Sequence, residues 1–592
     1  MTRYRRPARR FIIVLCLLVS TLLLVIPQTL AAHGGNREVT VGSNDNFFSR
    51  NKQNEPTVAI NPINTDIVVA GANDNIDMEL CNAGDDTTCP FTPNVGGTGF
   101  QVSLNRGDTW VQPTYTGLTA RHCTGAVGPD PDCVVQQGLI GTLPKYDDLN
   151  IISDGDPAVA WGPRPRNGNF SWSNGARLYF ANLTSNVTAN FGEPAFKGFE
   201  AIAVSRTDNI ASAAAGNENA WMRPVIASKQ SSATFSDKEQ IWADNAATSD
   251  FFGNVYVCYA EFRGAGAAPL VVSTSRDGGA TWETDQVSPA HNVAPKLFGQ
   301  SGCTIRTDSR GTAYVFYEEF QDPLNPSVGF PPKATQKLVQ SFDGGDTWTK
   351  PRTIQQVTDP CFFVDPVIGR CVMDGINGAR SDLAAAPSVD IANGTPTGGD
   401  ATDFMVLTWI DGRDGLNNED VMIAWSSDRG ATWSAPRRVS VSSDRGFYSA
   451  VALSPDGEDL YLVYNAFTTP FRTNTTQPRS LVGVVRHAEI GGGAPGVFTT
   501  LQRGATGDAR ASSQNDLQGE FLGDYVYASA TRDYAAAVWN DVRDGAVCPA
   551  INAFRAALQA GESPTPPRPN IDCAAKFGNT DIFGWSGADP TP

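Results

Sequence analysis

Short runs of β-branched and aromatic residues, separated by turn residues, recur along most of the chain. Apolar runs such as PTVAINP (56–62) and LAAAPSVDI (383–391) alternate with more aromatic runs such as NVYVCYAEFR (254–263) and LYLVYNAF (460–467). Period-two alternation between turn signals is typical of strands. Only residues 550–560 (AINAFRAALQA) have a helical pattern. The chain is therefore predicted to be an all-β protein with one helical decoration.

An octapeptide, Ser-x-Asp-x-Gly-x-Thr-Trp, lies before the last strand of several of these groups. Copies occupy residues 275–282, 341–348 and 426–433, and residues 103–110 carry Asn in place of Asp. A carboxylate can accept backbone N–H groups within a turn, glycine supplies a positive φ, and the hydroxyl groups complete the hydrogen bonding. Each copy thus predicts a tight hairpin turn, and we interpret its aspartate as structural, not as a catalytic acid or a calcium ligand.

The strand groups repeat as units that begin near residues 55, 156, 238, 302, 381, 447 and 524. Their mean pitch of about 78 residues exceeds the roughly 40–50 of short propeller blades. The excess lies in loop insertions near 111–153, 349–379 and 546–575. Four-stranded antiparallel units repeated radially form a β-propeller. We predict seven blades, with six as the alternative, and the octapeptides on the turns between strands three and four.

The last unit contains only three recognisable strands. The segment REVTVG (37–42), from the other end of the chain, could pair with TDIFGWS (580–586) and complete that blade. Closing a sheet ring in this way removes its exposed strand edges. We therefore predict that residues 37–42 close the ring.

The first 32 residues have the three parts of a secretory signal. An arginine-rich start is followed by an apolar run (11–26) and by small residues at Ala31 and Ala32. The apolar run is shorter than the roughly 20 residues that span a membrane, so an uncleaved anchor is the less favoured alternative. We predict a signal peptide over 1–32 and one secreted propeller domain, a monomer, over 33–592.

The cysteines favour the same compartment. Cys16 lies in the leader, and ten remain, an even number without CxxC spacing. Disulfides are therefore favoured over zinc ligation. Four pairs are close in sequence: Cys81 and Cys89, Cys123 and Cys133, Cys361 and Cys371, and Cys548 and Cys573. Cys258 and Cys303 remain after these four pairs. Other connectivities stay open.

The charge balance excludes several partner classes. The net charge is −17 with only four histidines, so nucleic acid, anionic membrane surfaces and a His-ligated zinc site are disfavoured. We expect no cofactor. Structural calcium could bind acid-rich turns at Gly84 to Asp86 or Asp411 to Asp414, but neither has EF-hand spacing.

Charged residues recur at equivalent loop positions on the face opposite the octapeptides. This ring includes Glu55, Asp156, Glu239, Arg380, Asp382, Arg413, Asp524 and Arg543, with Tyr448 and Tyr525 at matching places. Acids and bases that converge on a concave surface are common in binding and catalytic sites. Salt bridges between blades are the alternative for any single pair, such as Arg413 with Asp414.

The octapeptides resemble the Asp boxes, or bacterial neuraminidase repeats, of the sialidase superfamily. The resemblance implies a propeller with its active site on the face opposite the boxes. It also implies three arginines for a sialic acid carboxylate, a tyrosine nucleophile with a glutamate, and an aspartate acid/base. The Phe/Tyr-Arg-Ile-Pro motif of that family is absent, and Trp221-Met-Arg223-Pro224 is only a partial match.

Three functions follow from these residues. A sialidase-like exo-glycosidase would use Arg380, Arg413 and Arg543, pair Glu239 with Tyr448 or Tyr525, and take Asp156 as the acid/base. A glycosidase with two carboxylates would draw on Glu55, Asp156, Glu239, Asp382 and Asp524. The alternative is a non-catalytic propeller that binds extracellular carbohydrate or glycoprotein.

Overall fold

The computed structural model describes residues 1–2, 35–43, 45–81, 89, 92–123, 133–263, 268–290 and 298–591. Contacts divide the chain into two units, 1–32 and 33–592. The predicted signal peptide and its cleavage site lie outside the described residues apart from the first two positions, as does the acid-rich turn at 84–86. Among the described residues, no helix has the length and apolar character needed to cross a membrane.

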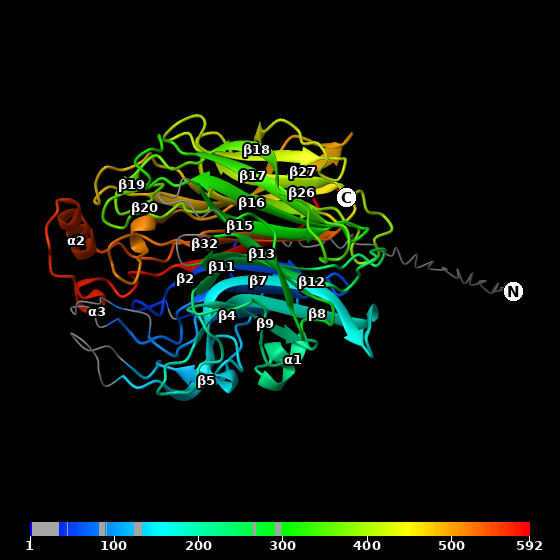
Figure 1. Ribbon diagram of the computed structural model, residues 1–592, viewed down its shortest axis with the longest axis horizontal. Coiled ribbons are helices and arrows are strands. Elements are labelled where there is room, and N and C mark those ends of the chain that lie inside the picture. The colour runs from blue at the N-terminus through cyan, green and yellow to red at the C-terminus, as the bar shows by residue number, and fades with distance from the viewer. Residues whose placement is uncertain are drawn as a thin grey trace. The chain divides into compact units, whose positions relative to one another are not determined.

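The described residues of the second unit form a seven-bladed β-propeller of antiparallel sheets (Figure 1), which confirms the predicted fold class and the favoured blade count. The first strands of the blades contact one another in a closed ring. Blade one is β2 (Gln53–Ile60), β3 (Val68–Asp74) and β4 (Thr98–Ser103); blade two is β7 (Ile151–Arg166), β8 (Asn169–Asn186), β9 (Ala201–Thr207) and β10 (Val225–Ile226); and blade three is β11 (Thr234–Ala243), β12 (Val255–Arg263), β13 (Leu270–Ser275) and β14 (Glu283–Gln286). Blade four is β15 (Phe298–Thr307), β16 (Ala313–Gln321), β17 (Lys333–Ser341) and β18 (Arg352–Thr358), and blade five is β21 (Ser388–Ile391), β22 (Met405–Asp411), β23 (Asp420–Ser426) and β24 (Arg437–Arg438). Blade six is β25 (Arg445–Leu453), β26 (Asp459–Phe467) and β27 (Ser480–Gly491) with β28 (Ala494–Pro495), β29 (Thr499–Arg503) and β30 (Gly507–Asp508), and blade seven is β31 (Tyr527–Ala530), β32 (Tyr534–Asp541) and β33 (Asp581–Ala588) with β1 (Arg37–Glu38).

The N-terminal strand closes the ring as predicted. In β1, Arg37 and Glu38 pair antiparallel with Gly584 and Phe583 of β33, and Val39 N–H donates to the carbonyl of Ile582. In blade one the fourth strand is reduced to a bridge between Val102 and Val111.

One predicted strand is shorter than expected. The run 383–391 is strand only over β21, because residues 381–386 fold into consecutive turns closed by Ala384 N–H to Ser381 O and Ala386 N–H to Leu383 O. Pro387 follows these turns and supplies no N–H for a ladder. Arg380 and Asp382 therefore lie on a loop ahead of blade five.

The octapeptides occupy the turns between the third and fourth strands. In the copy at 275–282, Asp277 Oδ1 accepts N–H bonds from Ala280 (2.9 Å) and Thr281 (3.0 Å), and Oδ2 accepts the Thr281 hydroxyl at 2.7 Å. Gly279 has φ +84°, and a Cβ there would lie 2.8 Å from Arg206 Cδ of the preceding blade. Trp282 packs against the apolar cluster shared by blades two and three. Each octapeptide is thus a turn that also fits its blade against the one before.

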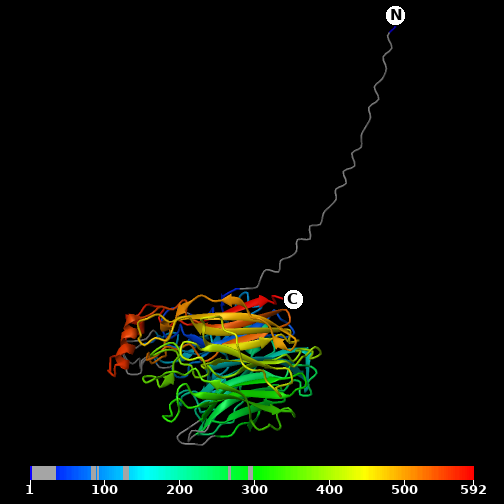
Figure 2. The ribbon, with the colours of Figure 1, turned by 90° about the horizontal axis from the view of Figure 1, so that it is seen from above.

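The insertions gather at the opposite end of the strands, which we call the top face. Figure 1 places α2 (Pro549–Gln559), α3 (Pro569–Asp572), β19 (Val364–Asp365) and β20 (Arg370–Cys371) at this end, and Figure 2 shows α2 there in a second view. Gln559 of α2 donates to Asp365 Oδ2 at 2.8 Å and joins two of these insertions. Helix α2 confirms the helical pattern at 550–560, whereas the short α1 (Ile210–Ala214) had no signal we recognised.

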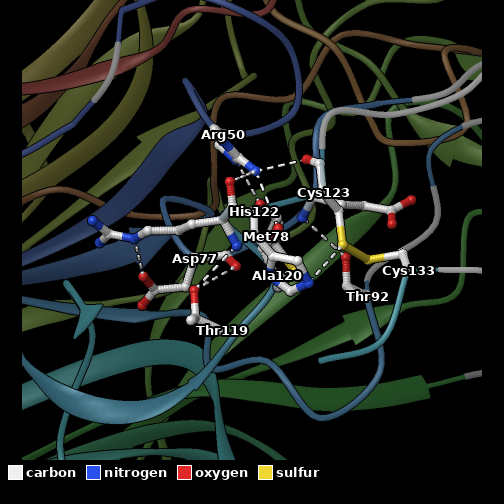
Figure 3. The surroundings of a disulfide bond; sticks show 11 residues. Arg50, Asp77, Met78, Thr92, Thr119, Ala120, His122, Cys123 and Cys133 are labelled. Atoms are coloured by element: carbon white, nitrogen blue, oxygen red, sulfur yellow. Dashed lines mark hydrogen bonds and ion pairs between the residues drawn. A yellow bond between two sulfur atoms is a disulfide. The ribbon is translucent and has the colours of Figure 1, made fainter. Parts of the chain in front are cut away.

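Five disulfides link the described cysteines, four of them within loops and one between strands β12 and β15. They are the four close pairs of the sequence plus Cys258–Cys303. Around Cys123–Cys133 (Figure 3), the Arg50 guanidinium donates to the carbonyls of Met78 (2.6 Å) and Cys123 (2.9 Å). The insertion after blade one, which contains β5 (Tyr115–Thr119) and β6 (Gln136–Ile140), is therefore closed by a disulfide and tied to the body by the half-buried guanidinium of Arg50.

Candidate functional site

Four consecutive blades carry the same distortion where the innermost strand begins. The register of β2, β7, β11 and β15 against the next strand shifts at equivalent positions, and the residue at each shift has a positive φ: Glu55 (56°), Asp156 (50°), Lys238 (59°) and Gly302 (62°). A bulge of this kind turns a side chain away from its normal pleat. Since non-glycine residues rarely adopt positive φ, three charged side chains are held here by the surrounding fold.

These bulges bring charges together at the top of the central channel. The ammonium of Lys238 lies 2.8 Å from both Asp156 Oδ2 and Asp524 Oδ2, and 3.7 Å from Glu55 Oε1. Only 13% of the Lys238 side chain is exposed. One buried cation from blade three thus joins carboxylates from blades one, two and seven.

Arg380 adds a second cation to the same group. Its guanidinium donates to Asp524 Oδ1 (3.0 Å) and Oδ2 (2.6 Å) and lies 3.6 Å from Glu55 Oε1. Its carbon Cζ also stands 4.5 Å from the centre of the Phe521 ring. We call Glu55, Asp156, Lys238, Arg380 and Asp524 the ion cluster.

Within the ion cluster the pKa values of the carboxyl groups shift in opposite directions. Burial opposes the ionisation of Asp156 and Asp524, but nearby cations outweigh it. Lys238 holds the pKa of Asp156 below its usual range, and Arg380, followed by Lys238, does the same for Asp524. Burial and the charge of Asp156 raise the pKa of Glu55 well above its usual range. Asn73 donates to Glu55 Oε2 at 2.5 Å. The cluster is therefore close to electrically balanced when Glu55 is protonated.

Both predicted tyrosines line a small cavity beside the ion cluster, together with Glu239 and Asp524. The Tyr448 hydroxyl donates to the Arg380 carbonyl at 2.8 Å and lies 3.3 Å from Asp524 Oδ1. Burial raises the pKa of Tyr448, Tyr525 and Glu239 well above their usual ranges. This channel cavity has a volume of about 60 Å³, which is room for a few water molecules.

Two predicted arginines do not join this group. Arg413 donates to both oxygens of Asp411 (2.9 and 2.5 Å), which also accepts the Trp409 indole N–H at 2.9 Å. The same Trp-x-Asp-x-Arg arrangement recurs as Trp539, Asp541 and Arg543. Each arginine is thus paired locally, with the aspartate two residues before it. The predicted alternative, a pair with the aspartate that follows it, is not the pair observed.

A larger pocket opens on the top face next to the ion cluster, between blades three, four and the 349–379 insertion. Its volume is about 260 Å³, just below the roughly 300–1,000 Å³ of ligand sites. Its lining includes Phe262, Phe320, Leu324, Asp237, Asp359 and Asp382. We call it the top pocket.

The carboxyl groups of the top pocket have unusual ionisation. Burial, followed by the charge of Asp382, raises the pKa of Asp359 to about 7, and burial raises the pKa of Asp237 to about 6. Asp382 has two cations near one oxygen, because Arg370 Nη1 and Arg380 Nε lie 3.0 and 4.0 Å from its Oδ2. Part-buried acids whose pKa is raised toward neutral pH are suited to proton transfer.

Sequence reasoning missed Asp359 and did not assign Lys238 a role. Asp359 lies in an insertion, two residues before Cys361, where no repeat marks it. Lys238, in contrast, stands at the start of a repeated unit, as Glu55 and Asp156 do. These equivalent positions were the sequence signal that could have placed Lys238 in the site.

No family model matches the chain, and no curated protein matches it. Similar solved structures include a Hadza microbial sialidase (13% identity, 70% of this chain and 63% of that one, TM-score 0.38) and Trypanosoma rangeli sialidase in complex with the inhibitor DANA (13%, 75% and 55%, 0.37). Another is an alpha-L-arabinofuranosidase from Fusarium graminearum (12%, 75% and 94%, 0.38). The chain spans less than two thirds of the length of the first two.

Proposed function

We propose that this protein is a secreted glycoside hydrolase that cleaves a terminal sugar bound in the top pocket. The observation that carries this proposal is the meeting of Asp359 and Asp382 beside two phenylalanine rings in a pocket of about 260 Å³. Aromatic faces pack against the apolar side of a sugar, and hydrolysis of a glycosidic bond needs one protonated and one ionised carboxyl group.

The environments of the two carboxyls suit these two roles. Asp359, with a pKa raised to about 7, is the candidate acid. Burial, followed by the charge of Asp524, raises the pKa of Asp382, but Arg380 and Arg370 beside it oppose this rise and favour its ionised form. Asp359 would donate its proton to the leaving oxygen as the bond to the anomeric carbon breaks. Asp382 would then attack that carbon directly or take a proton from an attacking water, depending on the carboxyl separation with the sugar bound.

The charge around the pocket favours a neutral sugar. Of the three arginines expected to grip a sialic acid carboxylate, Arg380 alone joins the ion cluster, and it is already paired with Asp524. A carboxylate sugar would also meet Asp237, Asp359 and Asp382 on the pocket wall, where the two cations, Lys238 and Arg370, are already paired with acids. Its charge would be repelled by whichever of them is ionised.

Secretion belongs to the same proposal. The described cysteines form five disulfides, which persist in oxidising compartments. Together with the predicted signal peptide, with its arginine-rich start and small residues at its end, this supports an extracellular substrate.

Sialidase-type chemistry in the channel cavity is the second candidate. It is favoured by one observation, that Glu239, Tyr448 and Tyr525 line the same cavity. Both Glu239 oxygens are buried without a hydrogen-bond partner among the described residues, so the glutamate could assist a tyrosine. The cavity would have to open before a sugar could enter.

A panel of fluorogenic glycosides, neutral pyranosides and furanosides beside a sialoside, separates these candidates. We expect release from at least one neutral glycoside, and loss of at least 100-fold in kcat for Asp382→Asn. Tyr448→Phe and Tyr525→Phe should keep most of the activity. Sialoside cleavage that both phenylalanine variants lose would contradict the top pocket. Glycan binding without turnover on any member would favour the non-catalytic alternative.

A further inference from the structure

Three carboxyl groups from opposite ends of the chain meet where the propeller ring closes. Glu38 lies on β1, Asp45 follows it, and Asp581 begins β33. One oxygen from each lies within 4.8 Å of the other two. The cluster therefore spans the junction between the N-terminal strand and the last blade.

One of these groups is deeply buried and lacks a partner. Asp581 is 2% exposed, and its Oδ1 has no hydrogen bond among the described residues, whereas Oδ2 accepts Asn579 Nδ2 at 3.1 Å. Asn579 is fully buried as well, and its own Oδ1 also lacks a partner in the described structure. A buried carboxylate oxygen without a donor is costly, so a missing ligand is indicated.

The surrounding charges are mostly negative. Asp541 of β32 stands directly opposite Asp581 in the sheet register, and like charges in that position repel. Arg543 is bound to Asp541. Among the described residues, the three acids form one ion pair with a basic side chain, in which Lys576 Nζ lies 3.6 Å from Asp45 Oδ2. Burial, followed by the charges of Glu38 and Asp45, raises the pKa of Asp581 to about 8.

We propose that Glu38, Asp45 and Asp581 bind a calcium ion that fastens the N-terminal strand to the last blade. Calcium takes six to eight oxygen ligands at about 2.3–2.6 Å and accepts irregular geometry. Oxygens within 4.8 Å of one another can therefore share one such ion. The unpartnered amide oxygen of Asn579 and water molecules could complete the shell. The site is distinct from the acid-rich turns noted in the sequence and independent of the proposed hydrolase activity.

The test is thermal unfolding and calorimetric titration of the chelator-treated protein with CaCl₂ alone, with MgCl₂ in a parallel arm. We expect a dissociation constant of roughly 0.1–1 mM and a rise in Tm of roughly 1–2 °C at saturating calcium. Asp581→Asn and Asp45→Asn should each weaken calcium binding at least tenfold. Glu283→Gln, an exposed acid on blade three, should leave it unchanged.

Asp45→Asn decides the outcome if Asp581→Asn fails to fold, because the Asp45 side chain is 42% exposed. No heat of calcium binding and no shift in Tm for the unmodified protein would overturn the proposal. So would a calcium response of full size in Asp45→Asn, or one that magnesium reproduces at equal concentration.

Discussion

Arg380 and Asp524 are joined by two hydrogen bonds, of 3.0 and 2.6 Å, although they lie 144 residues apart. Arg380 stands on the loop before blade five, and Asp524 stands just before the first strand of blade seven. The pair, with Lys238 from blade three, therefore links blades that are not neighbours in the ring. The ion cluster thus has a structural role whether or not it also contacts a substrate.

The first prediction concerns this link. Asp524→Asn keeps the shape but leaves the charges of Arg380 and Lys238 only partly matched in a buried position, so we expect a loss of about 3 kcal/mol in the free energy of unfolding. Urea denaturation would measure it. The control is Asp66→Asn, which removes an exposed partner of Arg106 and should cost less than about 1 kcal/mol. Equal losses in the two variants would show that the buried link adds nothing.

The second prediction is the acid sensitivity of the ion cluster. The pKa values of Asp156 and Asp524 are held below the usual range in the folded state. Their stabilisation is therefore fully present above the unfolded pKa, about 3.9, and is lost as the pH falls below it, because the unfolded chain then binds protons first. Urea midpoints should fall more steeply from pH 4 to pH 2 for the unmodified protein than for Asp524→Asn. An equal fall of the urea midpoint with pH in the two proteins would contradict this prediction.

The fold could be read from the sequence because its determinants are local and repeated. The octapeptide at 275–282 and its copies each fix one turn through their own side chains. Ring closure by residues 37–42 could be predicted because the last unit lacked a strand. The late start of the strand predicted over 383–391, which begins only at Ser388, was missed, since the turns before it depend on the loop that carries Arg380.

The site was predicted only in part, for a different physical reason. Glu55, Asp156, Arg380, Tyr448 and Asp524 meet because equivalent positions on neighbouring blades converge at the channel. Arg413 and Arg543 stand at equivalent positions too, but a preceding aspartate two residues away binds each one first. Asp359 belongs to an insertion outside the repeat, so no sequence period could place it in the top pocket.

The third prediction uses the one octapeptide with asparagine. Asn105 Oδ1 accepts the Thr109 N–H at 3.0 Å, as Asp277 accepts that of Thr281, but without charge. Charge-assisted hydrogen bonds are the stronger kind. Asn105→Asp should therefore stabilise the fold by about 0.5 kcal/mol, and Asp277→Asn should destabilise it by about 1 kcal/mol. Denaturation midpoints that move in the same direction for both would refute this account of the turn.

The fourth prediction concerns the proposed acid. Because Asp359 must be protonated and its pKa is raised to about 7, kcat should fall as the pH rises above 7. Asp359→Asn should abolish that limb and lower kcat by roughly 100- to 10,000-fold for a natural disaccharide. A substrate with an activated leaving group needs less protonation and should suffer less. A uniform loss on both substrates would instead indicate damage to the fold.

The most direct measurement of where the substrate binds is kcat/KM for the cleaved neutral glycoside in two matched leucine variants. Leu324, 62% exposed, lines the top pocket, whereas Leu416, 43% exposed, lies on another top-face loop outside it. We expect Leu324→Trp to lower kcat/KM at least tenfold by obstructing the pocket, with an unchanged Tm, and Leu416→Trp to behave as the unmodified protein. Full activity in Leu324→Trp would contradict the assignment of the top pocket as the catalytic site.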